Sequence, residues 1–432
     1  MASVNPPRGM RDFLPAEKAR RERVLAVIRE RYRAHGFDEI ETPVMEEYGR
    51  LHSGMGGDNE KLAYNVLKRG LDAEAVVGAT IGDGPVDIGA LADLGLRYDL
   101  TVPLARFYAS HRAELPTVFR AVQIAPVWRA ERPQKGRYRQ FVQCDIDIIG
   151  DASARAEAEL AIATLDTLDA LGLDGGRIRI NDRRALEWML DSFGFDAAER
   201  PGVLITIDKL DKIGPDGVAA ELRDRDATPV AVDAFEAFLR RPQTMEYNAF
   251  GERQIRKALP EGVPDDIVEH LVGIGRTVGA ARPGDGEVPL VFDAFLVRGM
   301  GYYTGTILEL AHPSVDYSLG GGGRYDGMIG RFLGQDVPAV GFSIGFERIV
   351  DLLDAAADAG SRAVVLVHDR DVPAHELLAL KARLVAEGAR VRLETRTKNL
   401  KALLERAAAD GYTSFATVSA GSSAELELKP LS

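Results

Sequence analysis

The chain has 432 residues, with 54 Lys and Arg against 66 Asp and Glu, and a formal net charge of −12 at pH 7. This length predicts two or three domains, and a hydrophobic content of 46% is ample for a buried core. The acidic balance argues against a protein that coats nucleic acid nonspecifically, so a nucleic-acid partner would have to meet local basic patches. The single cysteine, Cys144, excludes an internal disulfide and leaves no zinc-ligand spacing.

Membrane and export signals are absent from the sequence pattern. No apolar run approaches the ~20 residues that a membrane span requires. Residues 1–15 contain no apolar segment of the kind found in secretory signals. We therefore expect a cytoplasmic protein without a membrane partner.

The N-terminal part of the chain predicts one long helix and several short strands. Apolar residues at helical spacing predict an amphipathic helix over 15–35. A short strand is expected over 37–45, where Pro43 marks an edge or a bulge. Further short strands are expected over 64–68 and 76–80.

The run RYDLTVP at 97–103 precedes an apolar helix that is expected to end near His111. Asp99 and Thr101 can cap that helix. They can equally hold an ammonium group, which requires carboxylate and hydroxyl acceptors. The local sequence leaves both interpretations open.

Residues 119–150 predict two antiparallel strands joined by a charged loop. The second strand alternates by twos, so Gln143 and Asp147 lie on the face opposite Val142. Six Lys or Arg and one acid fall within 119–142. Arginines bind phosphate oxygens in bidentate fashion, so this hairpin suits a polyphosphate site. The simpler alternative is an antiparallel pair with a solvated, charged turn.

Several segments resemble those of class II aminoacyl-tRNA synthetases. FRAVQIAPVWRAERPQKGRYRQF, at 119–141, resembles motif 2 in the version found in histidyl-tRNA synthetases. GFDEIETPVME resembles motif 1, which lies at the homodimer interface in that family, and VPAVGFSIGFERI resembles motif 3. LVRGMGYYTGTILE resembles a segment peculiar to histidyl-tRNA synthetases, although Gly301 stands where the family usually has an acid.

This resemblance implies a role for each matched residue. Arg129 and Arg298 would be catalytic and bracket the α-phosphate of ATP. ATP, with Mg²⁺ bridging its oxygens, would be bound by Arg129, Glu131, Arg137, Phe141 and Arg348. Histidine would be bound by Asp99, Thr101, Gln143, Asp147, Arg298, Tyr302 and Tyr303. The glycine run at 318–327 would form the floor beneath the amino acid, and the protein itself would supply no metal site.

The resemblance also implies an α+β fold, with a class II synthetase-like antiparallel sheet flanked by helices. The catalytic core would comprise 1–182, with motifs 1 and 2, and 284–353, with motif 3. A helical insertion at 183–283 would clamp the acceptor arm of tRNA. Residues 362–432 would form a C-terminal α/β domain that resembles an anticodon-binding domain.

The implied activity is ATP-dependent attachment of L-histidine to tRNA(His) through a histidyl-adenylate, carried out by a homodimer. One alternative is a catalytically silent paralogue that acts as a regulatory subunit in histidine biosynthesis. Such paralogues typically lack the C-terminal domain and lose phosphate-binding arginines, whereas Arg129, Arg298 and Arg348 are all present here. A second alternative is an enzyme that activates histidine but charges a different acceptor.

Overall fold

The computed structural model describes residues 4–53, 57–79, 86–133, 136–241, 250–282, 288–298, 303–353, 362–420 and 426–431. The chain divides into two compact units, one formed by 1–11 and 26–351 and the other by 12–25 and 352–432. Within the described ranges, no helix is long and apolar enough to cross a membrane.

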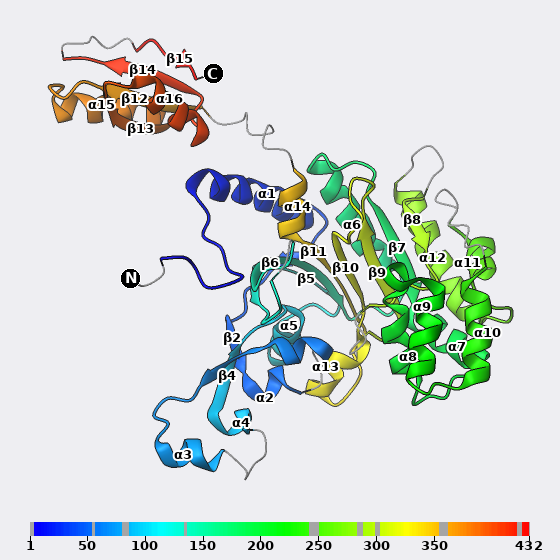
Figure 1. The fold of residues 1–432 in the computed structure, drawn as a ribbon. Helices are drawn as coiled ribbons and strands as arrows, with labels where there is room; N and C mark the ends of the chain where they lie inside the picture. Colours follow the sequence, from blue (N-terminus) through cyan, green and yellow to red (C-terminus); the bar gives the residue numbers. More distant parts are fainter. Residues whose placement is uncertain are drawn as a thin grey trace. The chain divides into compact units, whose positions relative to one another are not determined.

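An eight-stranded sheet lies at the centre of the first unit (Figure 1), in the order β1-β5-β6-β11-β10-β9-β7-β8. The six inner strands pair antiparallel, and β1 and β8 add parallel edges. This arrangement confirms the predicted antiparallel sheet flanked by helices. In sheet order, the strands are β1 (Asp38–Glu39), β5 (Phe119–Trp128), β6 (Gln140–Ile149), β11 (Ala339–Gly345), β10 (Gly320–Arg324), β9 (Thr306–Ala311), β7 (Arg177–Asp182) and β8 (Leu290–Phe292).

The two faces of this sheet differ in chemistry because side chains alternate along each strand. On β6, the apolar side chains of Cys144, Ile146 and Ile148 are fully buried and belong to the back face. Helices α6 (Ala154–Ala170) and α12 (Asp265–Ala281) pack against each other and against strands of the sheet. The opposite, front face carries the polar side chains of β6.

Two further helices pack at one end of the front face. These are α5 (Thr101–His111) and α13 (Asp326–Leu333). Tyr98, Leu104 and Ile329 lie in one buried apolar cluster with Phe119 and Ala121 of β5. This cluster fixes the loop before α5 against the polar part of the sheet, which is where the candidate site lies.

Residues 45–96 form a small separate sheet. Its strands are β2 (Met45–Glu47), β4 (Ala92–Leu96) and β3 (Tyr64–Leu67), with β4 in the middle. Among the described residues, four short helical segments accompany it, namely α2 (Tyr48–Leu51), the 3-10 helix η1 (Gly57–Leu62), α3 (Ala73–Gly78) and α4 (Ile88–Leu91).

Two strand predictions in this part of the chain need correction. The strand expected over 76–80 is wrong, because α3 (Ala73–Gly78) occupies most of it and the Asp72 carboxylate caps that helix by accepting from the Ala75 amide at 2.8 Å. The strand expected over 37–45 is two short strands, β1 and β2, on either side of Pro43.

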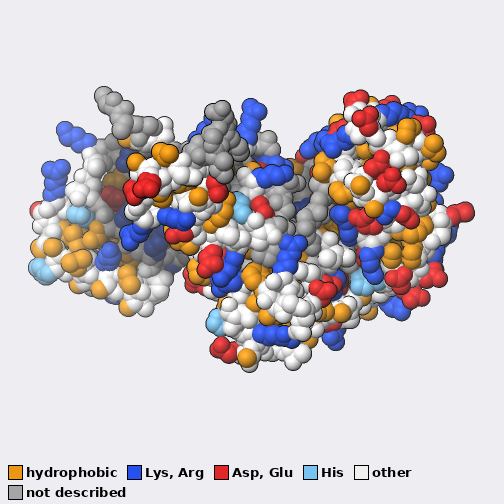
Figure 2. Space-filling view, turned by 90° about the horizontal axis from the view of Figure 1, so that it is seen from below, with side chains coloured by type: hydrophobic (Ala, Val, Ile, Leu, Met, Phe, Trp, Pro, Cys, Tyr) orange, Lys and Arg blue, Asp and Glu red, His pale blue; other side chains and the backbone are white. Residues whose placement is uncertain are grey.

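The described residues at 183–241 and 250–282 are mainly helical. The helices before α12 are α7 (Arg183–Phe193), α8 (Arg200–Ile207), α9 (Leu210–Asp224), α10 (Pro229–Leu239) and α11 (Glu252–Ala258). The Phe235 ring of α10 lies with its centroid 5.4 Å from that of Phe193 in α7 and 6.4 Å from that of Phe295, which follows β8. At the right of Figure 2, where these helices lie, acidic and basic side chains are interspersed. In one such pair, Nη2 of Arg223 in α9 lies 2.7 Å from Oδ1 of Asp233 in α10.

The second unit holds a four-stranded sheet in the order β13-β12-β14-β15. Helices α15 (Ala374–Ala386) and α16 (Leu400–Ala409) alternate with β12 (Ala363–His368), β13 (Arg390–Thr395) and β14 (Ser414–Val418). Apolar residues form one cluster with Val364 and another with Val365, so both faces of β12 are covered. The last strand, β15, is Lys429–Pro430.

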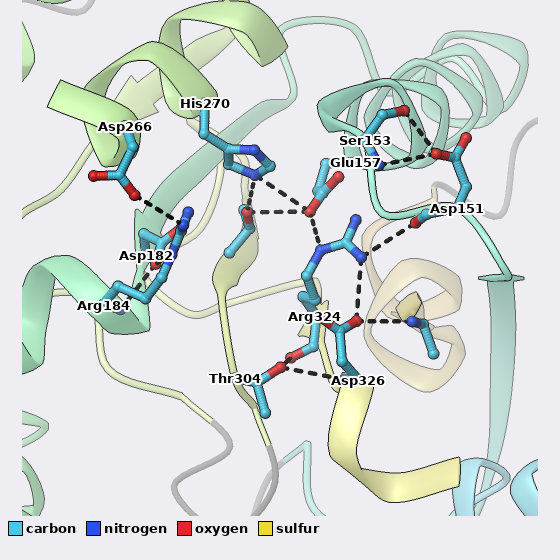
Figure 3. Close-up of polar contacts among 12 residues, drawn as sticks. Asp151, Ser153, Glu157, Asp182, Arg184, Asp266, His270, Thr304, Arg324 and Asp326 are labelled. Atoms are coloured by element: carbon cyan, nitrogen blue, oxygen red, sulfur yellow. Dashed lines mark hydrogen bonds and ion pairs between the residues drawn. The ribbon is translucent and has the colours of Figure 1, made fainter. Parts of the chain in front are cut away.

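A buried polar cluster holds the back of β10 in place (Figure 3). Arg324 Nε donates to Glu157 Oε1 of α6 at 2.7 Å, and Thr306 Oγ1 of β9 donates to the same oxygen at 3.2 Å. His270 of α12 lies 3.5 Å from that oxygen. Glu157 is fully buried, yet the hydrogen bonds from His270 and Arg324 outweigh burial and hold the pKa of its carboxyl below 4.5. The Glu157–Arg324 ion pair therefore stabilises the fold at neutral pH, and its contribution to the free energy of unfolding is lost on acidification.

The same arginine also reaches the front of the sheet. Arg324 Nη1 donates to Asp326 Oδ1 at 3.2 Å, and that oxygen accepts from the Ala339 amide of β11 at 2.8 Å. The Asp326 amide donates to Thr304 Oγ1 at 3.2 Å, as Figure 3 shows. The cluster therefore ties α6, α12, β9 and β11 to the segment on either side of β10.

The Arg324→Met variant should lower the free energy of unfolding of the first unit by about 3–5 kcal/mol, because it leaves the Glu157 carboxylate buried without its cation. Urea denaturation followed by tryptophan fluorescence measures this, since Trp128 and Trp188 both lie in that unit.

Arg256→Met is the matched control. Arg256 pairs with Glu252 and Asp265 at the surface, where water and salt screen the ion pairs, so its loss should change stability far less. Equal losses in the two variants would contradict the role given to the buried pair.

Candidate active site

Glycines on two adjacent strands make room for polar side chains on the front face. A Cβ at Gly321 would lie 2.4 Å from the Arg298 guanidinium carbon, and one at Gly323 would lie 3.1 Å from the Tyr303 ring. On β11, a Cβ at Gly341 would lie 1.9 Å from Asp147 Oδ1. Arg298, Tyr303 and Asp147 thus lie directly against peptide backbone. The glycine run at 318–327, which was predicted to lie beneath the amino acid, contains strand β10 at the centre of the sheet.

Three carboxylates are buried together at one end of this face. Asp145 and Asp147 project from β6, and Asp99 lies in the loop before α5; each is at most 4% exposed. Burial raises the pKa of Asp147 to about 7, against a hydrogen bond that Tyr325 Oη donates at 2.6 Å. Burial and then Asp147 raise the pKa of Asp145 well above its usual value. A cation placed here would therefore be held strongly.

Asp99 uses one carboxylate oxygen for the helix that follows it and leaves the other unpartnered among the described residues. Its Oδ1 accepts from the Val102 amide at 3.1 Å and so caps α5, which begins at Thr101. Its Oδ2 is buried and has no hydrogen-bond partner in the described part of the chain. Burial raises the pKa of this carboxyl to about 6, although the amides and Arg129 oppose the shift. One oxygen serves the helix while the other is available to a ligand.

Gln143 lies beside these acids on β6. Its Nε2 donates to Ser343 Oγ of β11 at 3.2 Å and approaches both carboxylate oxygens of Asp145 at 3.4 Å. Its Oε1 is buried and, among the described residues, unpartnered. Gln143 therefore offers a second free acceptor at the acidic end of the face.

Basic and aromatic side chains occupy the hairpin loop between β5 and β6. Arg129 Nε donates to the Tyr98 carbonyl at 2.9 Å, and the guanidinium lies 5.1 Å from the Phe141 ring centroid. Arg137 Nη1 donates to Glu131 Oε2 at 3.4 Å, with more than half of the Arg137 side chain exposed. Arg129 forms no ion pair within the described residues, so its charge remains available.

Arg298 and Arg348 approach the same region from the second part of the core. Arg298 Nη1 donates to Glu309 Oε2 of β9 at 2.5 Å and to Ser318 Oγ at 3.1 Å. Arg348, in α14 (Phe346–Leu352), donates to the Ser318 carbonyl and lies 5.4 Å from the Tyr317 ring centroid. Burial, and then the charges of Arg137 and Arg298, lower the pKa of Arg348. Such a group of mutually repelling cations is suited to an anion.

The structure thus brings residues far apart in sequence to one face, with Asp99, Thr101, Gln143, Asp147 and Tyr303 toward one end. Tyr302 lies outside the described residues. No cluster of three or more His, Cys, Asp or Glu side chains in the described part of the chain could hold a metal ion.

Sequence reasoning did not select four side chains of this face. Asp145 continues the alternation of Gln143 and Asp147, which was a usable signal. Glu309 is the one acid in an otherwise apolar strand and links Arg298 to Arg179, whose Nη1 donates to its Oε1 at 2.8 Å. Tyr325 and Ser343 gave no local signal, because their roles depend on strand pairing.

Comparison with known proteins identifies the family of the chain. A sequence profile described as histidyl-tRNA synthetase matches residues 9–71 and 86–349. The chain belongs to the histidyl-tRNA synthetase family. It is 59% identical over 438 aligned positions to a histidine--tRNA ligase of Leifsonia xyli subsp. xyli (strain CTCB07), which covers 100% of this chain and 99% of that protein.

Solved structures share the fold of the whole chain. A histidyl-tRNA synthetase from Nostoc sp. PCC 7120 superposes with a TM-score of 0.76 at 26% identity, covering 100% of this chain and 95% of that one. An ATP phosphoribosyltransferase regulatory subunit/histidyl-tRNA synthetase from Bacillus halodurans C superposes with a TM-score of 0.74, covering 98% and 100% of the two chains. At 19% identity, the second likeness concerns the fold alone.

The raised pKa values predict that histidine binds more tightly as the pH rises. With folded pKa values of about 7 for Asp147 and about 6 for Asp99, these groups lose their protons across this range. The dissociation constant for histidine should fall by about 10-fold or more between pH 6 and pH 8, since each pKa unit corresponds to a tenfold change. Isothermal titration calorimetry measures this and should also show proton release on binding.

The same carboxyls affect the unliganded protein in the opposite direction. Their folded pKa values exceed the unfolded ones, so stability is lost as the pH rises through about 7.

Asp147→Asn should remove most of the pH dependence of histidine binding between pH 6 and 8. An undiminished pH dependence in that variant would assign it to other groups.

Proposed function

We propose that this chain attaches L-histidine to tRNA(His) in two steps that consume ATP. The observation that carries the proposal is a single sheet face on which three buried carboxylates, none of them in an ion pair within the described residues, lie near several arginines, of which Arg129 likewise forms no ion pair there. That arrangement suits an amino acid, which presents a cation, together with a polyphosphate. Family membership and the full-length relative named histidine--tRNA ligase support the reaction class.

The acidic end of the face would hold histidine. Asp99 Oδ2 and Gln143 Oε1 are buried acceptors, and Asp147 carries a carboxylate that Tyr325 holds in place. These groups can accept hydrogen bonds from the ammonium and imidazole N–H groups of histidine, with Thr101 and Tyr303 beside them. An apolar amino acid would leave the same acceptors unpaired in a buried site, which is the basis of strong rejection.

The basic residues would hold ATP and promote adenylate formation. A carboxylate oxygen of histidine attacks the α-phosphorus, the new P–O bond forms, and pyrophosphate leaves with the electron pair of the broken bond. Arg129 and Arg298 would neutralise the charge that develops on the α-phosphate oxygens. Positioning and fixed positive charge supply the rate enhancement, because no covalent step through the protein is needed.

The remaining contacts to the nucleotide follow from the same face. Phe141 and the exposed edge of Arg348 offer surfaces for the adenine ring, Glu131 offers an acceptor for its amino group, and Arg137 would meet the outer phosphates. Mg²⁺ would accompany ATP as a further partner, since the phosphate oxygens themselves are its preferred ligands. A hydroxyl of the terminal ribose of tRNA then attacks the histidyl carbonyl and AMP leaves.

The proposal also covers the oligomeric state, the cellular location and the role of each domain. We assign the chain to the cytoplasm, where charged tRNA is consumed, and to a homodimer through the motif 1 segment at 36–46. Residues 183–283 would contact the acceptor arm as an insertion, between core parts at 1–182 and 284–353. Residues 362–432 would contact the anticodon arm, where the guanidinium groups of Arg390 and Arg392 lie 4.2 Å and 4.6 Å from the Tyr412 ring centroid.

Histidine-dependent exchange between ATP and pyrophosphate, run beside charging of total tRNA, tests the function. Exchange with charging is the expected result. Exchange without charging would point to another acceptor. Histidine binding without exchange would favour a regulatory subunit, which the 59% full-length identity to a ligase does not favour.

Arg298→Ala should reduce the exchange rate by about 10²–10³-fold, because it removes a fixed cation beside the reacting phosphate. Histidine should still bind measurably by calorimetry. Arg298→Lys serves as the control, since it keeps the charge but not the bidentate geometry, and should retain intermediate activity. Unchanged exchange in the alanine variant would remove Arg298 from the proposed mechanism.

Asp147→Ala should raise the KM for histidine far more than the KM for ATP. The carboxylate lies at the acidic end of the face, while the arginines that would bind ATP do not contact it in the described residues. Exchange kinetics with each substrate varied in turn measure the two constants. Equal losses for both substrates would mean that Asp147 does not contact histidine.

A further inference from the structure

Ser343, on β11, is not among the residues proposed to bind histidine or ATP. It lies directly opposite Asp145 of β6 and, on the other side, opposite Gly321 of β10. Its side chain therefore shares the front face with Gln143 and Asp145. Gln143 is one of the side chains proposed to bind histidine. Ser343 and Asp145 lie next to it on the same face of the sheet.

The hydrogen bonds of Ser343 have a defined direction. Its Oγ accepts from Gln143 Nε2 at 3.2 Å, and Ser343 lies directly opposite Asp145, whose ionised form its hydroxyl favours. A serine hydroxyl carries one proton, and with that proton directed at Asp145 its oxygen serves as an acceptor. The amide nitrogen of Gln143 is the donor that meets this oxygen.

The carboxylate of Asp145 imposes the same orientation. Both of its oxygens lie 3.4 Å from Gln143 Nε2, and the ionised form of this carboxyl would repel the amide oxygen at that place. The other end of the amide, Gln143 Oε1, is consequently directed away from both residues. It is buried and lacks a hydrogen-bond partner in the described part of the chain.

Gln123 on the neighbouring strand provides a contrast. It lies opposite Asp145 from the other side, but its Oε1 accepts from Thr42 Oγ1 at 3.2 Å and its Nε2 donates to the Leu100 carbonyl at 3.1 Å. Both ends of that amide are used within the protein. Of these two amides, that of Gln143 is held from one end, while its Oε1 has no hydrogen-bond partner among the described residues.

We propose that Ser343 and Asp145 are positioning residues that fix the amide of Gln143 with its oxygen toward the bound amino acid. In this orientation Gln143 accepts a hydrogen bond from an N–H of histidine. The flipped amide would present a donor to a donor, so the pair selects for a substrate that offers N–H at this point. The inference rests on the proposed function and concerns its substrate specificity.

The test is a double-mutant cycle between Ser343→Ala and Gln143→Ala, measured by histidine-dependent pyrophosphate exchange. Ser343→Ala should raise the KM for histidine by about 10-fold and change the KM for ATP by less than about twofold, since one hydrogen bond loses its fixed geometry. In the Gln143→Ala background, the same change should have less than about a twofold effect. Effects of Ser343→Ala that are equal in both backgrounds would overturn the proposal.

Two further variants keep the inference testable if the alanine variant is destabilised. Ser343→Thr retains the hydroxyl and should retain most of the affinity for histidine, whereas Asp145→Asn, which can pair with either end of the amide, should raise the KM for histidine. The matched control is Ser414→Ala, the same change on β14 of the second unit, which should leave both KM values unchanged. A normal KM for histidine in Asp145→Asn would contradict the proposal.

The controls also separate this inference from the proposed function. If the unmodified chain shows no histidine-dependent exchange, the proposed function fails. If it shows exchange and Ser343→Ala keeps the same KM for histidine, only the positioning role fails.

Discussion

The close approach of backbone to backbone at the centre of the sheet is the constraint on which the rest of the structure depends. At Gly322 a Cβ would lie 2.0 Å from the Gly341 carbonyl oxygen, so β10 and β11 cannot pair in this way with side chains there. Glycines on alternate positions leave the front face free for Arg298 and Tyr303. The loss of side-chain contacts is offset on the back face, where Arg324 and Glu157 connect β10 to α6.

The front face separates two kinds of charge over a short distance. Burial raises the pKa values of the acids at one end, and burial followed by the charges of Arg137 and Arg298 lowers the pKa of Arg348 at the other. Each end is unfavourable by itself and becomes favourable when it meets the complementary group of a substrate. A ligand that brings an ammonium group and a polyphosphate together, such as histidine with ATP, therefore relieves both.

Much of this arrangement could be predicted from the sequence. The hairpin strands, α1 and α5 follow from hydrophobic periodicity, and the charge of the hairpin loop indicates a phosphate site. The strand over 76–80 failed because β-branched residues there outweighed the capping Asp72 in our interpretation. The run of glycines gave no strand signal, because glycine has low strand propensity and its place in β10 is decided by the neighbouring strands.

The sequence by itself determined the family, the order of the motifs and the types of side chain that could meet histidine and ATP. These are local properties of residue type and spacing. Only the tertiary structure decided that Glu309 pairs with Arg298, that Tyr325 donates to Asp147, and that Ser343 lies opposite Asp145. These contacts join residues far apart in the chain, and they depend on which distant strands become neighbours in the sheet, which no local pattern specifies.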